Sequence, residues 1–309
     1  MKHTGAVTTV ATLLLIALLA GSVLARQKQE TLRGKEATLE EILYLPSGKM
    51  LKRMSLGYSS LLANIYWTRA VQYFGSRYHE QSSRFDLLGP LLDITTELDP
   101  HLVVAYETGS IFLSQPWPQG AGQPEKAVAL LERGIRENPE RWHLYFTLGF
   151  LHYVDRQDYK AAQEAFDKGS QVPGAQPWMK VMAARMAEHG GDIATAIDLW
   201  VAVYNNDKDQ NVRDNAVNHL LSLRADAGIE DLQRRVQAYR ERTGALPREW
   251  SGLVRAGFLP GIPLDPTGAP YKLMPDGAVR VQDPSKFRFL GEFQAQARKR
   301  QQTTSGNRE

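Results

Sequence analysis

Residues 145–173 read YFTLGFLHYVDRQDYKAAQEAFDKGSQVP, and this stretch decides the fold. Bulky apolar residues recur at helical spacing on both sides of a polar turn, which predicts two short antiparallel helices. Small residues at Gly149 and Ala162 let the two backbones approach closely, and Phe166 fills the gap beside them. Pro173 ends the second helix, because proline lacks the amide hydrogen that a helix interior needs. The stretch therefore predicts a helical hairpin.

The same hairpin signature recurs along the chain. Ala127, Ala162 and Ala196 take equivalent positions in the second helix of successive hairpins, at intervals of 35 and 34 residues. A more divergent copy precedes them at Leu88, and the insertion PWPQGAGQP lengthens its interval to 39 residues. One hairpin cannot bury its own apolar face, so about three or more must stack to hide a continuous core. The period favours an array of stacked hairpins over an ordinary helical bundle.

A known repeat family shares this motif. The pattern Y-x2-L-G-x2-H at 145–152, followed by A-x3-F at 162–166 and by Pro173, is similar to the tetratricopeptide-repeat (TPR) pattern W-x2-L-G-x2-Y…A-x3-F…P, with His152 in place of the second aromatic residue. Residues 57–207 therefore resemble TPR proteins. The resemblance implies an all-α fold, a right-handed superhelix of about three to four helix pairs with capping helices and a concave ligand groove. It implies adaptor, chaperone or assembly roles and brings no catalytic residues.

Composition and periodicity divide the chain into five expected parts. Residues 210–224 and 229–243 are also expected to form two helices, divided at Ala227-Gly228. The five parts are residues 1–25, a transmembrane anchor or signal peptide; 26–50, a polar linker; 51–228, the TPR-type array; 229–293, a helix followed by a Pro/Gly-rich segment of turns and short strands; and 294–309, a polar tail expected to be disordered.

The first part carries the clearest membrane signal. Residues 6–25, AVTTVATLLLIALLAGSVLA, contain no charge for 20 residues, and a helix of that length spans the roughly 30 Å hydrocarbon core. Two interpretations fit, a retained single-pass anchor or a cleavable signal peptide with a small-x-small site at Val23-Leu24-Ala25. We favour the anchor, with the bulk of the chain outside the cytoplasm. Four cations just after the run favour the opposite orientation, which leaves the orientation open.

The C-terminal part shows a second, shorter resemblance. The patterns T-G-x2-P at 243–247 and P-x-D-P-x-G-x2-Y at 263–271 are similar to the end of type II secretion pseudopilins. That resemblance implies a small region of strands and turns after a long helix. The N-terminal apolar run lacks a prepilin-type glutamate, so we do not interpret the whole chain as a pilin. The alternative is a Pro/Gly-rich wrap that packs against the last repeat.

Composition and motifs argue against several classes of function. The chain has 37 Lys+Arg and 34 Asp+Glu, so its net charge is only +3 and nucleic acid is not an expected partner. It contains no cysteine, which excludes disulfides, thiolate zinc sites and thiol nucleophiles. His143 and His152 lack an acidic partner at zinc-ligand spacing, and there is no HExxH, Walker or nucleophile-elbow motif. We expect no enzyme activity, no cofactor, no metal site and no small-molecule substrate.

Binding residues are expected on the first helix of each hairpin, on the face that lines the groove. The middle hairpin offers a row of rings on which apolar side chains of an extended or helical peptide can dock, while Glu107 or Arg185 fixes its polarity. The alternative is that the PWPQGAGQP turn or the C-terminal segment covers some of these rings. The predicted set is Glu107, Ile111, His143, Phe146, Phe150, Tyr153, Trp178, Val181 and Arg185.

These observations predict a membrane-anchored scaffold that binds proteins or peptides in the bacterial envelope. The pseudopilin resemblance implies a link to pilus or secretion machinery. The alternative is a soluble TPR binding protein, exported after cleavage of a signal peptide. Finding the mature terminus at Arg26 would select that alternative.

Overall fold

The structure is a computed structural model of the 309-residue chain, and it describes residues 46–292. This part is mostly helical, as the sequence predicts, and the described residues divide into two compact units, 46–105 with 116–121 and 106–115 with 122–292. The elements are α3 (Gly48–Met54), α4 (Ser59–His79), α5 (Leu88–Leu98), α6 (Val103–Ser114), α7 (Pro124–Glu137), α8 (Trp142–Val154), α9 (Tyr159–Ser170), α10 (Trp178–Gly190), α11 (Ile193–Asn206), α12 (Gln210–Thr243), α13 (Trp250–Arg255), β1 (Lys272–Leu273), β2 (Val279–Arg280) and the 3-10 turn η1 (Pro284–Lys286).

The predicted anchor at residues 6–25 and the predicted tail at 294–309 lie outside the described residues. Between residues 46 and 292, no helix is both long enough and apolar enough to cross a bilayer. The first described helix, α3, begins at Gly48, where the Ser47 hydroxyl accepts a hydrogen bond from the amide of Met50 at 3.2 Å. Such a side-chain cap satisfies one of the free amides that every helix start presents.

In the first unit, α3 and α4 both pack against α5. The buried face of α4 consists of Ala63, Tyr66 and Ala70. Near its end the ring of Phe74 lies 5.7 Å from that of Phe85, which precedes α5. The small residues Ala63 and Ala70 bring the two helices close together, and the aromatic pair closes the hairpin between them.

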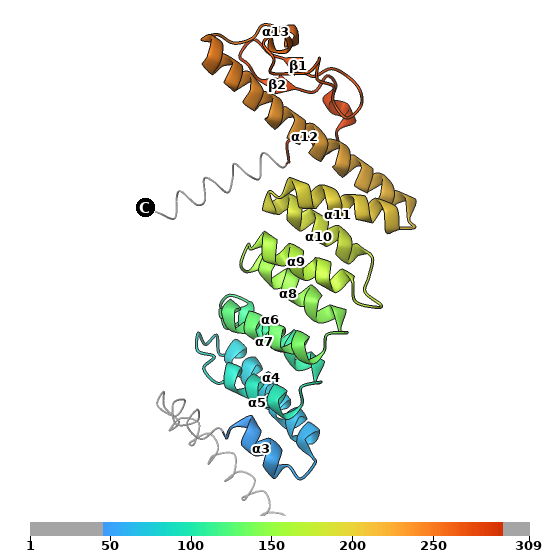
Figure 1. Ribbon diagram of the computed structural model, residues 1–309. Helices are drawn as coiled ribbons and strands as arrows, with labels where there is room; N and C mark the ends of the chain where they lie inside the picture. The colour runs from blue at the N-terminus through green and yellow to red at the C-terminus, as the bar shows by residue number, and fades with distance from the viewer. Residues whose placement is uncertain (1–45, 293–309) are drawn as a thin grey trace, which may run out of the picture. The chain divides into compact units, whose positions relative to one another are not determined.

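In the second unit, each helix from α7 to α12 packs against the next one along the chain (Figure 1, green to orange). Close approach depends on glycines, as the sequence predicts. A Cβ atom on Gly149 would lie 2.8 Å from the ring of Phe166, and one on Gly134 would lie 2.7 Å from the ring of Tyr106. The aromatic residue of each pair therefore occupies the space that a side chain at the glycine would need.

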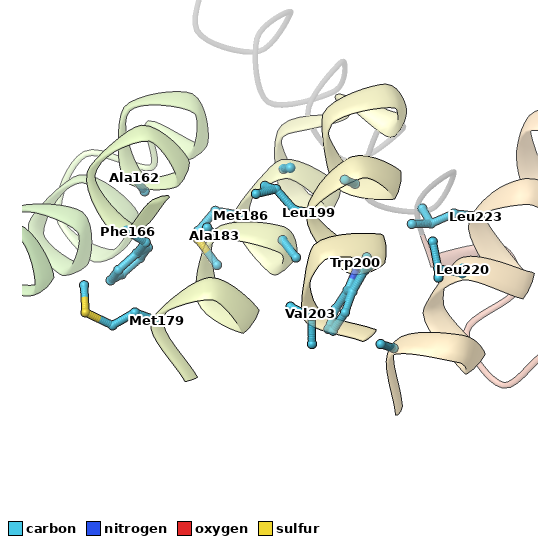
Figure 2. Packing of buried hydrophobic residues seen from close by; sticks show 14 residues of the cluster. Ala162, Phe166, Met179, Ala183, Met186, Leu199, Trp200, Val203, Leu220 and Leu223 are labelled. Carbon is cyan, nitrogen blue, oxygen red and sulfur yellow. The ribbon is translucent and has the colours of Figure 1, made fainter. Parts of the chain in front are cut away.

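A continuous apolar core runs from α9 to the first half of α12. Figure 2 shows Phe166, Met179, Trp200 and Leu220 in succession between these helices. Aspartates cap the starts of α9 and α11, since Asp158 accepts from the amide of Ala161 and Asp192 from that of Thr195, both at 3.0 Å. The packing of neighbouring helix pairs on one another is compatible with a repeat protein.

The prediction of two helices at 210–224 and 229–243 is wrong, because α12 is one continuous helix of 34 residues. Gly228 does not break it. A Cβ atom at Gly228 would collide with the hydroxyl of Tyr271, which lies against the helix at that point and donates to the carbonyl of Ala225 at 3.4 Å. The glycine provides room for a residue of the C-terminal segment, at the cost of about 1 kcal/mol in helix propensity.

The C-terminal segment, residues 244–292, forms a second core against the later half of α12. Trp250, Leu253, Tyr271 and Val279 are buried there, together with Ile229, Leu232 and Val236 of the helix. The strands β1 and β2 pair antiparallel, with Lys272 opposite Arg280, and the indole of Trp250 donates to the carbonyl of Tyr271 at 2.7 Å. Helix α12 therefore contributes to both of these cores.

Candidate functional site

Four of the predicted binding residues form one continuous surface, which we call the aromatic shelf: Phe146, Phe150 and Tyr153 of α8 with Trp178 of α10. The three α8 residues share a helix face, because they are four and then three positions apart. Ring centroids lie 6.1 Å apart for Phe146 and Phe150, 6.5 Å for Phe150 and Tyr153, and 5.2 Å for Phe146 and Trp178. These separations fall in the range that aromatic pairs prefer.

The shelf has two anchored rings and two exposed ones. Phe146 and Tyr153 pack against the core, and the ring of Phe146 lies 6.1 Å from that of Phe166. Phe150 and Trp178 keep 48% and 40% of their surface exposed. The shelf is therefore a fixed apolar surface, because its exposed rings rest on rings that the core holds in place.

The aromatic surface is wider than the sequence predicted. The ring of Trp142 stacks on His143 at 3.6 Å and meets Trp178 edge-on at 6.0 Å. At the other end Tyr153 contacts His189 at 6.2 Å, and Tyr159 stacks on the same imidazole at 5.6 Å. Trp142 could have been found from its place beside His143, whereas Tyr159 and His189 come from two different helices that only the tertiary fold joins.

The remaining predicted residues are not part of the shelf. Ile111 is 42% exposed on α6. Burial raises the pKa of the Glu107 carboxyl, while the nearby positive charges of His143 and Arg141 act in the opposite direction. Val181 is partly buried against the core. The structure thus brings Glu107 near Arg141 and His143 at the start of α8.

Arg185 lies in a different environment from the shelf, beside a buried cluster that the sequence analysis missed. The ring of His219 on α12 is stacked between two other rings, 4.1 Å from Trp200 and 3.9 Å from Phe289. Its Nδ1 atom is 2.8 Å from an oxygen of Glu188, and the indole of Trp200 donates to the same oxygen at 2.8 Å. We call Glu188, Trp200, His219 and Phe289 the His219 cluster.

Two backbone amides near the end of the C-terminal segment donate hydrogen bonds to side chains of α12. The amide of Phe289 donates to the Ser222 hydroxyl at 3.1 Å, and the amide of Gly291 donates to the two Asp226 carboxylate oxygens at 3.2 and 3.1 Å. Burial raises the pKa of Asp226 to about 6, although the Gly291 amide acts to lower it. His219, Ser222 and Asp226 lie along one stripe of α12, and this stripe holds Phe289 and Gly291.

The space beside the His219 cluster is too small for an organic substrate. Its volume is about 20 Å³, room for a single water molecule, and its walls include Arg185, His189, Asp226 and Glu292.

His152 of α8 is also buried, and burial lowers the pKa of its imidazole. Within residues 46–292, no group of three or more His, Asp or Glu is placed to hold a metal ion.

No protein-family model matches the chain, and no curated protein matches it.

Proposed function

We propose that this chain is a non-enzymatic scaffold whose aromatic shelf binds a segment of a partner protein, and that its helix pairs form a TPR-type superhelix. The observation that carries the proposal is the exposure of Phe150 and Trp178 on rings that the core fixes. Rigid aromatic side chains contribute more than most to protein interfaces, because they bury a large area and lose little conformational entropy. A row of such rings on successive helices suits the apolar face of a peptide.

Charged groups at the two ends of the aromatic surface support an oriented ligand. Glu107 lies near His143 at the start of α8, and Arg185 lies near His189 at the end of α10. A bound segment can place apolar side chains on the shelf and charges of opposite sign at its ends. No nucleic acid or small molecule is part of the proposal, since the chain is close to charge balance and the shelf is apolar.

We propose further that the scaffold is anchored in a bacterial envelope by residues 6–25, with its bulk outside the cytoplasm. The uncharged run of 20 residues supports the anchor, and the pseudopilin-like pattern at 243–271 supports a place near pilus or secretion machinery. The intact mass of the membrane-extracted chain tests the anchor. A mass of 34.7 kDa is expected, whereas a chain that begins at Arg26 would identify a cleaved, exported binding protein.

Recovery of partners from detergent-solubilised membranes tests the shelf. Phe150→Ala and Trp178→Ala should each reduce recovery of the specific partner on the order of tenfold, the usual effect of removing a central aromatic contact. The matched control is Tyr204→Ala, which removes a ring that is 37% exposed on α11. Circular dichroism should show unchanged helicity in all three variants. Undiminished recovery by both shelf variants, or an equal loss with Tyr204→Ala, would contradict the proposal.

A further inference from the structure

The first unit carries an exposed apolar surface that the aromatic shelf does not include. It spans α3, the turn after it and the first half of α4. We call it the N-terminal patch, and its members with their exposed fractions are Met50 55%, Met54 63%, Leu56 87%, Tyr58 70%, Leu61 59% and Ile65 48%.

Helical geometry explains why these side chains point outwards together. In α4, Leu61 and Ile65 are one turn apart, and Tyr58 precedes Leu61 by three residues, so the three share one face. The residues that pack against α5, including Ala63 and Tyr66, lie roughly 100° or more around the helix from that face. The core of the unit is therefore complete without the N-terminal patch, and the patch is available to a partner.

The charged side chains of α3 and α4 themselves all have one sign, although Glu97 of α5 lies against Gly48 at the start of α3. Residues 46–79 contain Lys49, Lys52, Arg53, Arg69 and Arg77 and not a single aspartate or glutamate, although the whole chain is nearly balanced at 37 basic and 34 acidic residues. Lys49, Lys52 and Arg53 are exposed and alternate with the methionines of α3. Apolar side chains interleaved with lysine and arginine are typical of segments that lie in the interface of an anionic membrane.

We propose that the N-terminal patch lies on the surface of an anionic lipid bilayer, with the apolar side chains of α3 and α4 in the headgroup region. An exposed tyrosine such as Tyr58 suits this position, because its ring is apolar and its hydroxyl stays hydrated. The lipid phosphates are the anions that Lys49, Lys52 and Arg53 contact. This surface is separate from the aromatic shelf, and it shares with the proposed function only the location at a membrane.

The length of the preceding chain is compatible with this placement. Between the end of the predicted anchor at Ala25 and Pro46 there are 21 residue steps, which reach at most ~75 Å when fully extended. An anchored chain therefore keeps the N-terminal patch within reach of the bilayer. A bilayer also explains the charge better than a protein partner does, because it offers many anionic groups over a wide area without a matching contour.

The absence of cysteine allows the N-terminal patch to be probed at single positions. The variants Leu56→Cys and Leu61→Cys carry a polarity-sensitive fluorophore in the full chain, reconstituted singly into nanodiscs of phosphatidylcholine with or without phosphatidylglycerol. The matched control is Ile262→Cys, an aliphatic residue that is 62% exposed in the C-terminal segment. With phosphatidylglycerol, the labels at 56 and 61 should shift to shorter wavelength and resist a water-soluble quencher. The label at 262 should do neither.

Charge reversal tests the role of the cations. Lys49→Glu, Lys52→Glu and Arg53→Glu together should abolish the shielding of the labels at 56 and 61, with unchanged circular dichroism. Labels at 56 and 61 that are quenched as readily as the one at 262 would overturn the inference. So would shielding that survives charge reversal, or shielding that appears in detergent without lipid and grows with protein concentration, which would reveal a second copy as the occupant. A chain cleaved at Arg26 is tested with vesicles of the same lipids, so that loss of the anchor is not mistaken for failure of the patch.

Discussion

Replacing Asp226 by asparagine should stabilise the protein at neutral pH. Asp226 is 2% exposed, and its carboxylate accepts hydrogen bonds from the amide of Gly291. Asparagine has nearly the same shape and keeps an acceptor oxygen for that amide, but it carries no charge. The substitution Asp226→Asn therefore removes the cost of burying a charge and keeps the attachment of the C-terminal segment.

The size of the effect follows from the pKa of Asp226. That pKa is raised from 3.8 to about 6, a shift of about 2 units, and each unit corresponds to about 1.4 kcal/mol. Because the pKa is higher in the folded state, the folded protein is favoured by protonation. The stabilisation is complete below the unfolded pKa near 3.8 and is lost as the pH rises through about 6. At pH 7.5 the free energy of unfolding of Asp226→Asn should exceed that of the wild type by roughly 1 to 3 kcal/mol.

Urea denaturation of the purified chain at several pH values measures the difference in the free energy of unfolding. The advantage of Asp226→Asn should be largest at pH 7.5 and should shrink steadily towards pH 4.5. The control Asp283→Asn should instead lower the free energy of unfolding at neutral pH. Hydrogen bonds from Ser285 lower the pKa of the exposed Asp283, so removing its negative charge is unfavourable there. A variant at 226 that is less stable than the wild type at pH 7.5, or an advantage independent of pH, would refute the reasoning.

Two further predictions concern packing. Phe146→Ala should lower the free energy of unfolding by about 2 to 4 kcal/mol, because the Phe146 ring packs on the core. Phe150→Ala should change it by less than about 1 kcal/mol, because the Phe150 ring is exposed. Urea denaturation measures both, and equal losses would place Phe150 in the core as well. Gly228→Ala should destabilise the protein by about 1 to 3 kcal/mol, because the added methyl group displaces Tyr271. The control Gly75→Ala changes a helical site with open space around it and should stabilise the protein by up to about 1 kcal/mol. Thermal unfolding measures both, and equal shifts of the two midpoints would contradict this role of Gly228.

The mostly helical fold could be predicted because its signals are local. Gly149 and Phe166 are 17 positions apart, and one hairpin is enough to bring them together. The aromatic shelf was also accessible, since Phe146, Phe150 and Tyr153 share one face of one helix. In both cases the helical period alone decides which residues are neighbours.

The features that the sequence analysis missed depend on distant partners. The sequence analysis interpreted Gly228 as a helix break. The glycine is instead required by the close approach of Tyr271, which lies in a segment with no helical period of its own. The hydrogen bonds of Phe289 and Gly291 with α12 join positions 67 and 65 residues apart, and Glu188 contacts His219 across 31 residues. Nothing in the spacing of His219 distinguishes a stacked, paired imidazole from any other residue on the buried face of a helix.

Because α12 belongs to two cores, the end of the helical array cannot fray independently. Its first half completes the core of α9 to α11, and its second half carries Trp250, Tyr271 and Val279 of the C-terminal segment. In an ordinary linear array the outermost member opens most easily, since it has a neighbour on one side only. Here α12 also packs against the C-terminal segment. Deleting residues 244–292 would expose the apolar face of the later half of α12 and destabilise the helices α9 to α11 that pack against its first half.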